Sequence, residues 1–257
     1  MQITYAGGPV VRRPLVYSSF WGPGWTDPVH QAQASQLNQF HQDLLNSSVM
    51  DVLTQYGILG PGAGAFVNAS FLPWVPRVLT VAKYQNIIQS NVLPGALPPQ
   101  QAGSHVILLY LDEHIIINDP ATGRQLNFLG AYDVGYHEFF TTAAGDPVYY
   151  GFVAYSANTD DTTTVASHEF AEIITDPEYD AWSPDGGMTE IGDLCEQGQD
   201  TITVGANRWT VQKIWSNIDN SCVCRASHLT WEIQPGPAQK KLPSAAAGWR
   251  CGKVRAI

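Results

Sequence analysis

One short stretch of the chain combines a histidine with two glutamates at spacings that suit a metal site. His168 and Glu172 are four residues apart, and Glu169 directly follows the histidine. On a helix, residues four apart lie on the same face with about 5 to 6 Å between their Cβ atoms, so the imidazole and the carboxylate can bind one ion. Both groups are ordinary zinc ligands. The spacing predicts a zinc ion held by His168 and Glu172, with Glu169 beside it.

The same spacing resembles the H-E-x-x-H pattern of zinc metallopeptidases. In that pattern two helix residues hold the metal and the intervening glutamate acts as general base. Here Glu172 replaces the second histidine. The expected reaction is peptide hydrolysis, in which Glu169 takes a proton from a metal-activated water and passes it to the leaving amine. Candidates for stabilising the oxyanion are Tyr149, Tyr150, Tyr179 and His137.

A third metal ligand is needed, because catalytic zinc usually has three protein ligands. Five of the eight glutamates fall within 28 residues, where carboxylates repel one another unless a cation compensates. We expect Glu190 to be the third ligand, because its separation of 22 residues from His168 is close to that in thermolysin-like peptidases. Asp193 and Asp176 are expected to support the ligands through hydrogen bonds. Glu178 and Asp176 are the alternative third ligands.

A non-catalytic extracellular protein is the main alternative. In that case the acidic cluster would bind Ca²⁺ or zinc as a structural ion, and tryptophan and tyrosine side chains would recognise polysaccharide or another protein. Ca²⁺ prefers oxygen ligands throughout, whereas His168 favours a transition metal. A serine hydrolase is disfavoured because the sequence contains no G-x-S-x-G turn.

The amino-acid composition limits the classes of partner that the protein is expected to bind. The net charge is -10, and five of the thirteen basic residues lie in the last eighteen positions, so phosphate backbones would be repelled. No apolar run reaches the roughly 20 residues of a membrane span, and the N-terminal residues do not form a signal peptide. The few lysines and many Trp, Tyr, Asn, Gln, Ser and Thr residues favour an extracellular protein that acts on a peptide or protein substrate.

Four cysteines lie in the last quarter of the chain and permit three pairings. Cys222 and Cys224 are too close in an extended segment to bond to each other comfortably. We favour pairing of Cys195 with Cys222 and of Cys224 with Cys251. A structural zinc site is less favoured, since no second C-x-C or C-x-x-C accompanies the first.

The elements that would position these residues can be predicted in outline. The helix with His168 is expected to begin in the polar segment NTDDTTT and to end before Pro177. SHVILLYLD predicts the central strand, and residues 147–156 predict a strand whose edge would pair with an extended substrate. Further predictions are a strand in RRPLVYSSFW, helices from Asp27-Pro28, from Val49 to Tyr56 and over residues 80–92, and loop or short strand over residues 57–73.

Strands and helices mixed along 257 residues predict an α+β protein with one main domain over residues 1–225. The following residues 226–257 are rich in Pro, Ala and Lys and are predicted to be a C-terminal tail or small extension.

Four separated stretches, in order, resemble bacterial relatives of the plant phosphate-induced, or exordium-like, proteins: YAGGPVVRRPLVYSSFWGPGW, SHEFAEIITDPEYDAW, EIGDLCE and WTVQKIWSNIDNSCV. The resemblance covers residues 1 to about 225. It implies an exported protein with a zincin-like fold, in which a mixed twisted sheet packs on helices. His168, Glu169 and Glu172 match the family's H-E-x-x-E segment. Glu190 and Asp193 match its E-I-x-D segment. Cys195 and Cys222 match the cysteines of its disulfide.

Overall fold

A five-stranded sheet organises the protein. The computed structural model describes residues 2–96, 104–119, 124–127, 134–184 and 189–227. The strand order is β3-β2-β5-β9-β8, with β8 antiparallel to β9 and the other neighbours parallel. The sheet is therefore mixed, and the predicted central strand, β5, lies in the middle. The strands are β2 (Leu15–Trp21), β3 (Ala65–Leu72), β5 (His105–Leu111), β8 (Gly135–Thr141) and β9 (Pro147–Ala154).

Helices cover both faces of this sheet. On one face lie α1 (Pro28–Leu44), α2 (Ser48–Leu53) and α5 (Thr159–Thr175); on the other lie α3 (Val81–Ile87), a π-helical turn (Ile88–Val92) and α4 (Leu93–Ala96). The predicted helices are thus present. The start of α1 matches its sequence signals, because the Asp27 side chain accepts a hydrogen bond from Val29 N and Pro28 occupies the first helical position.

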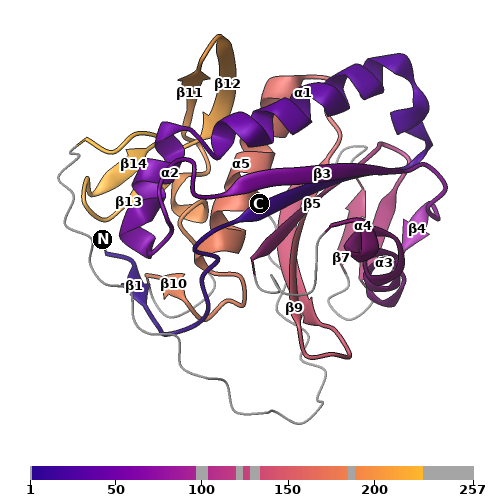
Figure 1. Ribbon diagram of the computed structural model, residues 1–257, viewed down its shortest axis with the longest axis horizontal. Coiled ribbons are helices and arrows are strands. Elements are labelled where there is room, and N and C mark those ends of the chain that lie inside the picture. Colours follow the sequence, from indigo (N-terminus) through magenta and orange to yellow (C-terminus); the bar gives the residue numbers. More distant parts are fainter. Residues whose placement is uncertain (1, 97–103, 120–123, 128–133, 185–188, 228–257) are drawn as a thin grey trace.

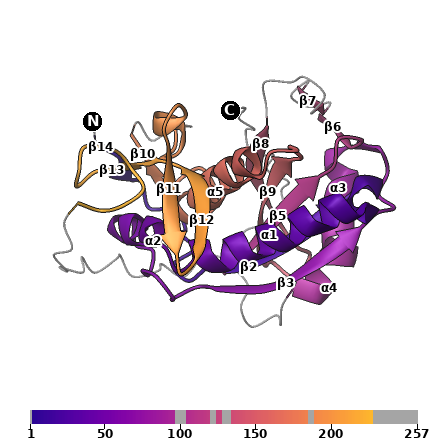
Figure 2. The ribbon, with the colours of Figure 1, turned by 90° about the horizontal axis from the view of Figure 1, so that it is seen from above.

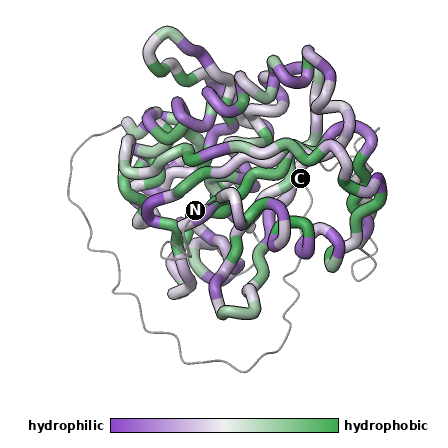
Figure 3. Tube along the Cα trace, turned by 45° about the vertical axis from the view of Figure 1, so that its right-hand side comes forward, coloured by the Kyte–Doolittle hydropathy of each residue, from purple (hydrophilic) through white to green (hydrophobic). Residues whose placement is uncertain are grey.

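Two apolar layers fill the space between sheet and helices. The first lies between the sheet and α1, α2 and α5, where the predicted stripe of Leu37, Phe40 and Leu44 is buried. The second lies on the α3 side, where Tyr84 and Ile88 pack against Ile107 and Phe152. Figure 2 shows the helices beside the sheet, and Figure 3 shows hydrophobic colouring concentrated in the central strands. The chain is an α+β protein, as expected.

Smaller elements complete the described part of the chain. They comprise the pairs β1 (Thr4–Tyr5) with β10 (Trp182–Ser183), β11 (Gln199–Val204) with β12 (Asn207–Gln212) and β13 (Ile214–Ser216) with β14 (Ser221–Val223), the three-stranded sheet of β4 (Val78–Leu79), β6 (Ile116–Asp119) and β7 (Arg124–Asn127), and 3₁₀ turns at Pro23–Thr26, Thr54–Tyr56 and Asp193–Cys195. Among the described helices, none has the length and apolar character that crossing a membrane requires.

One expectation about strands needs correction. The predicted strand over residues 147–156 exists as β9, but β5 and β8 pair with both of its edges, so it cannot receive a substrate strand. The edge strand on this side is β8. Segment 57–73, predicted to be loop or short strand, contains the strand β3, which begins at Ala65, beyond the cluster of glycines, and is eight residues long.

The predicted disulfide between Cys195 and Cys222 is confirmed, with Cα atoms 5.7 Å apart. Cys224 is buried and forms no disulfide with another described residue. Its expected partner, Cys251, lies outside the described residues, as does the predicted tail from residue 228 onward. The second disulfide and the domain boundary near residue 225 stay predictions.

Candidate metal centre

Helix α5 carries the H-E-x-x-E residues, as predicted. Its first turn is capped by Asn158, whose side chain accepts a hydrogen bond from Asp160 N. The helix ends at Thr175, and the N–H of Asp176 donates to the Glu172 carbonyl. Proline at 177 then prevents another helical turn.

Two glycines bring α5 close to strands β8 and β9. A Cβ atom at Gly135 would lie 2.5 Å from Oε1 of Glu169, and one at Gly151 would lie 3.0 Å from Cδ1 of Ile173. A larger residue at either position would have to displace these side chains, so the two glycines permit the close approach of the helix to the sheet. Because His137 pairs with Gly151 in the β8–β9 ladder, this close approach also brings His137 to the helix.

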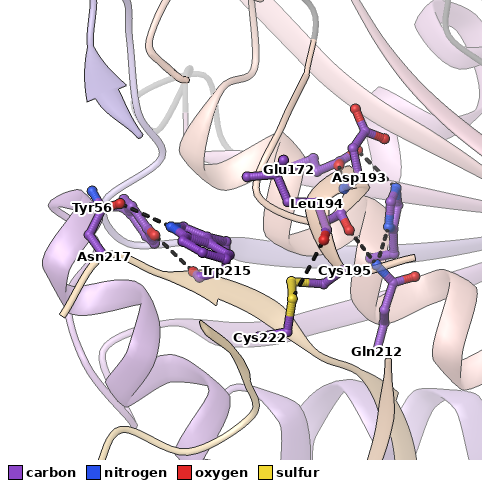
Figure 4. The surroundings of a disulfide bond; sticks show 11 residues. Tyr56, Glu172, Asp193, Leu194, Cys195, Gln212, Trp215, Asn217 and Cys222 are labelled. Atoms are coloured by element: carbon purple, nitrogen blue, oxygen red, sulfur yellow. Dashed lines mark hydrogen bonds and ion pairs between the residues drawn. A yellow bond between two sulfur atoms is a disulfide. The ribbon is translucent and has the colours of Figure 1, made fainter. Parts of the chain in front are cut away.

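The His168 imidazole and the Glu172 carboxylate, the two ligands predicted from helical spacing, face each other. His168 Nε2 and Glu172 Oε2 are 3.1 Å apart. The other carboxylate oxygen, Oε1, accepts a hydrogen bond of 3.2 Å from Asp193 N. On the far side of the His168 ring, Nδ1 lies 2.8 Å from Nε2 of Gln212, whose amide also donates to Gly192 O at 2.8 Å. Figure 4 shows Glu172, Asp193 and Gln212 gathered next to the disulfide.

His137 adds a second imidazole to the cluster. Its Nδ1 lies 3.7 Å from Glu169 Oε2 and 3.6 Å from Glu172 Oε2, and its Nε2 lies 3.6 Å from Glu190 Oε1. Tyr179 holds this histidine, because the two rings stack with centroids 4.9 Å apart and the tyrosine hydroxyl donates to the His137 carbonyl. The His137 ring is therefore fixed among three carboxylates.

The predicted third ligands occupy different places. Two three-residue groups have ligand atoms that all lie within 4.8 Å of one another: His168, Glu172 and Asp193, and His137, Glu169 and Glu172. Among the described residues, Glu190 completes no such group with His168 and lies beside His137 instead. Of the alternatives, Glu178 accepts a hydrogen bond from Tyr149 OH, whereas Asp176 accepts one from Ala181 N through Oδ1 and leaves Oδ2 buried without a hydrogen-bond partner.

The cluster is almost sealed from solvent. His168 and Glu169 are 0% exposed, Glu190 is 2% exposed and His137 is 4% exposed. Several of their buried atoms have no hydrogen-bond partner, namely Nε2 of both histidines, both carboxylate oxygens of Glu169 and Oε1 of Glu190. A small gap of about 10 Å³ remains, close to the space one water molecule needs. Its lining consists of Tyr136, His137, Glu169, Glu172, Tyr179, Glu190 and Asp193.

Burial and mutual charge shift the pKa values within the cluster. Burial alone would lower the pKa of His168, but Glu172 outweighs it and raises this pKa to about 9. Burial would likewise raise the pKa of Glu172, but His168 and His137 lower it to about 2. Burial raises the pKa values of Glu169 and Glu190. Despite burial, the carboxylates Glu190, Glu169 and Glu172 raise the pKa of His137.

Two residues at this site, His137 and Gln212, were not predicted from the sequence as ligands or as their hydrogen-bond partners. His137 was one of four candidates for the oxyanion and not a candidate ligand, although the tripeptide His-Glu-Phe occurs at both 137–139 and 168–170. Gln212 gave no signal, because a glutamine in a polar hairpin strand has no distinctive spacing to the helix. Its role depends on α5 packing against β12, where Thr163 OH donates to Thr210 O.

No family model, curated protein or solved structure matches the chain. Fold and site together define its class as an α+β protein with a disulfide and a buried cluster of histidines and carboxylates.

Proposed function

We propose that this protein is a secreted, zinc-dependent metallopeptidase of the zincin-like kind. The observation that carries the proposal is a buried group of two imidazoles and three carboxylates, in which both oxygens of Glu169 and Oε1 of Glu190 have no hydrogen-bond partner. Buried polar groups normally find hydrogen-bond partners, so such a set is typical of a site that receives an ion. The disulfide supports the oxidising compartment of an exported protein.

The donor atoms fit a zinc ion. Bond lengths of about 2.0 to 2.2 Å in a tetrahedral site separate neighbouring ligand atoms by about 3.3 Å. The separation of 3.1 Å between His168 Nε2 and Glu172 Oε2 is close to that value. Asp193 and Glu190 are the carboxylates at hand for a third position, with Asp193 grouped with His168 and Glu172. Mixed nitrogen and oxygen donors favour zinc over Ca²⁺.

The chain's own residues divide the remaining work. Zinc, when bound, supplies the Lewis acidity that polarises a carbonyl group and acidifies water. Glu169 acts as general base and then as acid, and burial suits it to this role by raising its pKa. His137 and Tyr179 line the gap beside Glu169; the His137 imidazole would be the donor for a developing oxyanion, because the Tyr179 hydroxyl already donates to the His137 carbonyl. The edge of β8 that pairs with no described strand, rather than β9, would receive an extended peptide.

A non-catalytic, metal-stabilised extracellular protein is the second candidate. The observation that favours it is the sealing of the cluster, because a gap of about 10 Å³ admits an ion or a water but not a peptide. In that case the ion, Zn²⁺ or Ca²⁺, would tie α5 to the loop with Asp193 and to β8. Polysaccharide or protein recognition would then occur elsewhere on the surface.

The test combines metal analysis with one substitution. Protein purified without chelators is analysed for bound zinc and calcium and is incubated with an unfolded protein substrate. Glu169→Gln should keep its zinc and lose hydrolysis by about 100-fold or more, because the general base is removed. The matched control is Glu196→Gln, which changes an exposed glutamate and should keep full activity.

The possible results separate the two candidates. Zinc in all three proteins, with hydrolysis lost only in Glu169→Gln, supports the peptidase. Bound metal without hydrolysis in any of them supports the structural ion. Absence of any bound metal after incubation with zinc contradicts both.

A further inference from the structure

We propose that the cluster contains a second cation site, formed by His137, Glu169 and Glu172, and that filling it inhibits hydrolysis. This inference rests on the proposed function, because it concerns the residue assigned there as general base. The second site differs from the site expected at His168 in its position and in its effect on hydrolysis.

The geometry separates the two sites. His137 Nδ1 lies 3.7 Å from Glu169 Oε2 and 3.6 Å from Glu172 Oε2, too far for good hydrogen bonds but near the spacing of two ligands on one ion. His168 belongs to the other group, with Glu172 and Asp193. No single set of ligand atoms within 4.8 Å contains both histidines among the described residues. One ion therefore cannot use the two imidazoles as they stand.

The open space lies at the second group. The gap of about 10 Å³ is lined by His137, Glu169 and Glu172, whereas His168 is not among its lining residues. Glu172 belongs to both groups, and its Oε2 faces both imidazoles. Glu172 would therefore be a ligand of both ions if both sites were filled, as in enzyme centres that hold two metals.

The unpartnered atoms also favour a second ion. Both carboxylate oxygens of Glu169 are buried without a hydrogen-bond partner, and the residue is fully buried on the wall of the gap. Four carboxylates gather in the cluster, those of Glu169, Glu172, Glu190 and Asp193. With both imidazoles neutral as ligands and all four carboxylates ionised, one divalent ion would offset two negative charges and a second would offset the other two. A charge left unbalanced in a buried site is costly.

Occupation of the second site has a direct chemical consequence. A carboxylate oxygen of Glu169 that coordinates a cation cannot take a proton from water. The second ion therefore competes with catalysis, and zinc should activate the protein at low concentration and inhibit it in excess. Because the two sites share the Glu172 carboxylate, whichever ion binds second should bind at least tenfold more weakly, and activation at low zinc requires that the His168 site fills first.

The experiment counts ions in the full chain by equilibrium dialysis against a zinc series. Wild-type protein should bind two zinc ions per chain at saturation, and His137→Gln should bind one. His168→Gln should also bind one, now at the second site. His114→Gln, which changes an exposed histidine outside the cluster, is the control for surface binding and should keep both ions. Glu169→Gln serves as a second test of the same site if His137→Gln fails to fold.

Activity adds an independent comparison. Wild-type hydrolysis should rise with the first equivalent of zinc and fall with excess, whereas His137→Gln should show no fall relative to its own maximum. Saturation of wild type at one ion, or retention of two ions by both His137→Gln and Glu169→Gln, overturns the second site while leaving the first intact. Two ions without any hydrolysis supports the second site and contradicts the peptidase.

Discussion

At the scale of single residues, Gly192 shows how tightly the loop after residue 188 approaches the helix. A Cβ atom at this position would lie 2.6 Å from His168 Nδ1 and 2.7 Å from Glu172 Oε1. The carbonyl of Gly192 also receives the hydrogen bond from Gln212, which contacts the same imidazole. A glycine is therefore required at this position for the loop to pack directly against both proposed ligands.

Replacing this glycine should damage the metal centre more than the fold. We expect Gly192→Ala to weaken zinc binding by at least tenfold, because its methyl group must displace either the His168 ring or the Glu172 carboxylate. Zinc affinity, measured by competition with a chelating dye, checks this. Gly198→Ala is the control, since its nearest neighbours would be 3.2 to 3.3 Å away and none belongs to the cluster. Equal affinity in the two variants would refute the proposed contact.

The site residues that were correctly predicted to be neighbours are those that lie on a single element. His168, Glu169 and Glu172 follow from helical spacing alone, because the helix fixes their relation locally. The contributions of His137 and Gln212 depend on how β8 and β12 pack against α5, which no local spacing encodes. Glu190 was placed by its separation along the chain, and that separation cannot tell His168 from His137 as its neighbour.

At the scale of elements, the disulfide ties the proposed ligand loop to the C-terminal hairpin. Cys195 ends the 3₁₀ turn that begins at Asp193, and Cys222 lies in β14, which pairs with β13. Trp215 N also donates to Ile191 O, so the hairpin supports the segment between Glu190 and Asp193 from below. Figure 4 shows this arrangement of disulfide, Trp215 and Asp193.

Removal of this crosslink should lower both stability and metal affinity. Closing a loop of 27 residues lowers the conformational entropy of the unfolded chain, which stabilises the folded state by about 3 to 4 kcal/mol. We expect the double variant Cys195→Ala and Cys222→Ala to lose about 2 to 4 kcal/mol in denaturant titrations and to bind zinc more weakly. Cys224→Ala, which removes a buried cysteine outside the disulfide, is the control for zinc affinity. Unchanged zinc affinity in the double variant would show that the loop is held by other contacts.

Elements were predictable where their sequence signal was strong. The apolar run of β5 and the capped polar start of α5 each specify one element with little ambiguity. Strand β8, with His137 and Glu138 in its middle, lacks a continuous apolar run, and β3 follows a Gly-rich segment that favours a loop. The order of strands depends on non-local pairing, so the edge position of β8 could not be read from the chain.

At the scale of the whole molecule, a buried histidine connects helix α1 to the centre of the sheet. His41 is 1% exposed, and its Nε2 lies 2.6 Å from the hydroxyl of Tyr110 on β5. The imidazole that shares this hydrogen bond is neutral, because burial lowers the pKa of His41 from 6.5 to about 3. The main apolar layer therefore contains a group that must stay uncharged for the fold to persist.

This histidine should make the protein sensitive to acid. Between pH 6.5 and about 3 the unfolded chain binds a proton that the folded chain excludes, so stability is full above pH 6.5 and is lost as the pH falls. The loss from this group between pH 7 and pH 4 is about 3 kcal/mol. Asp176 acts in the opposite direction, because burial raises its pKa to about 6, but it is present in every variant compared.

The measurement compares denaturant titrations of wild type and His41→Gln at pH 7 and pH 4. Glutamine keeps a polar group near Tyr110 but cannot titrate, so we expect the variant to lose about 3 kcal/mol less than wild type on acidification. Comparing each protein with itself removes the constant cost of the substitution. His114→Gln is the control, since its exposed side chain should leave the acid sensitivity of wild type unchanged. If wild type and His41→Gln lose equal stability, the acid sensitivity must come from carboxylates whose pKa values the fold lowers, such as Glu172, whose stabilising ionisation is lost as the pH falls.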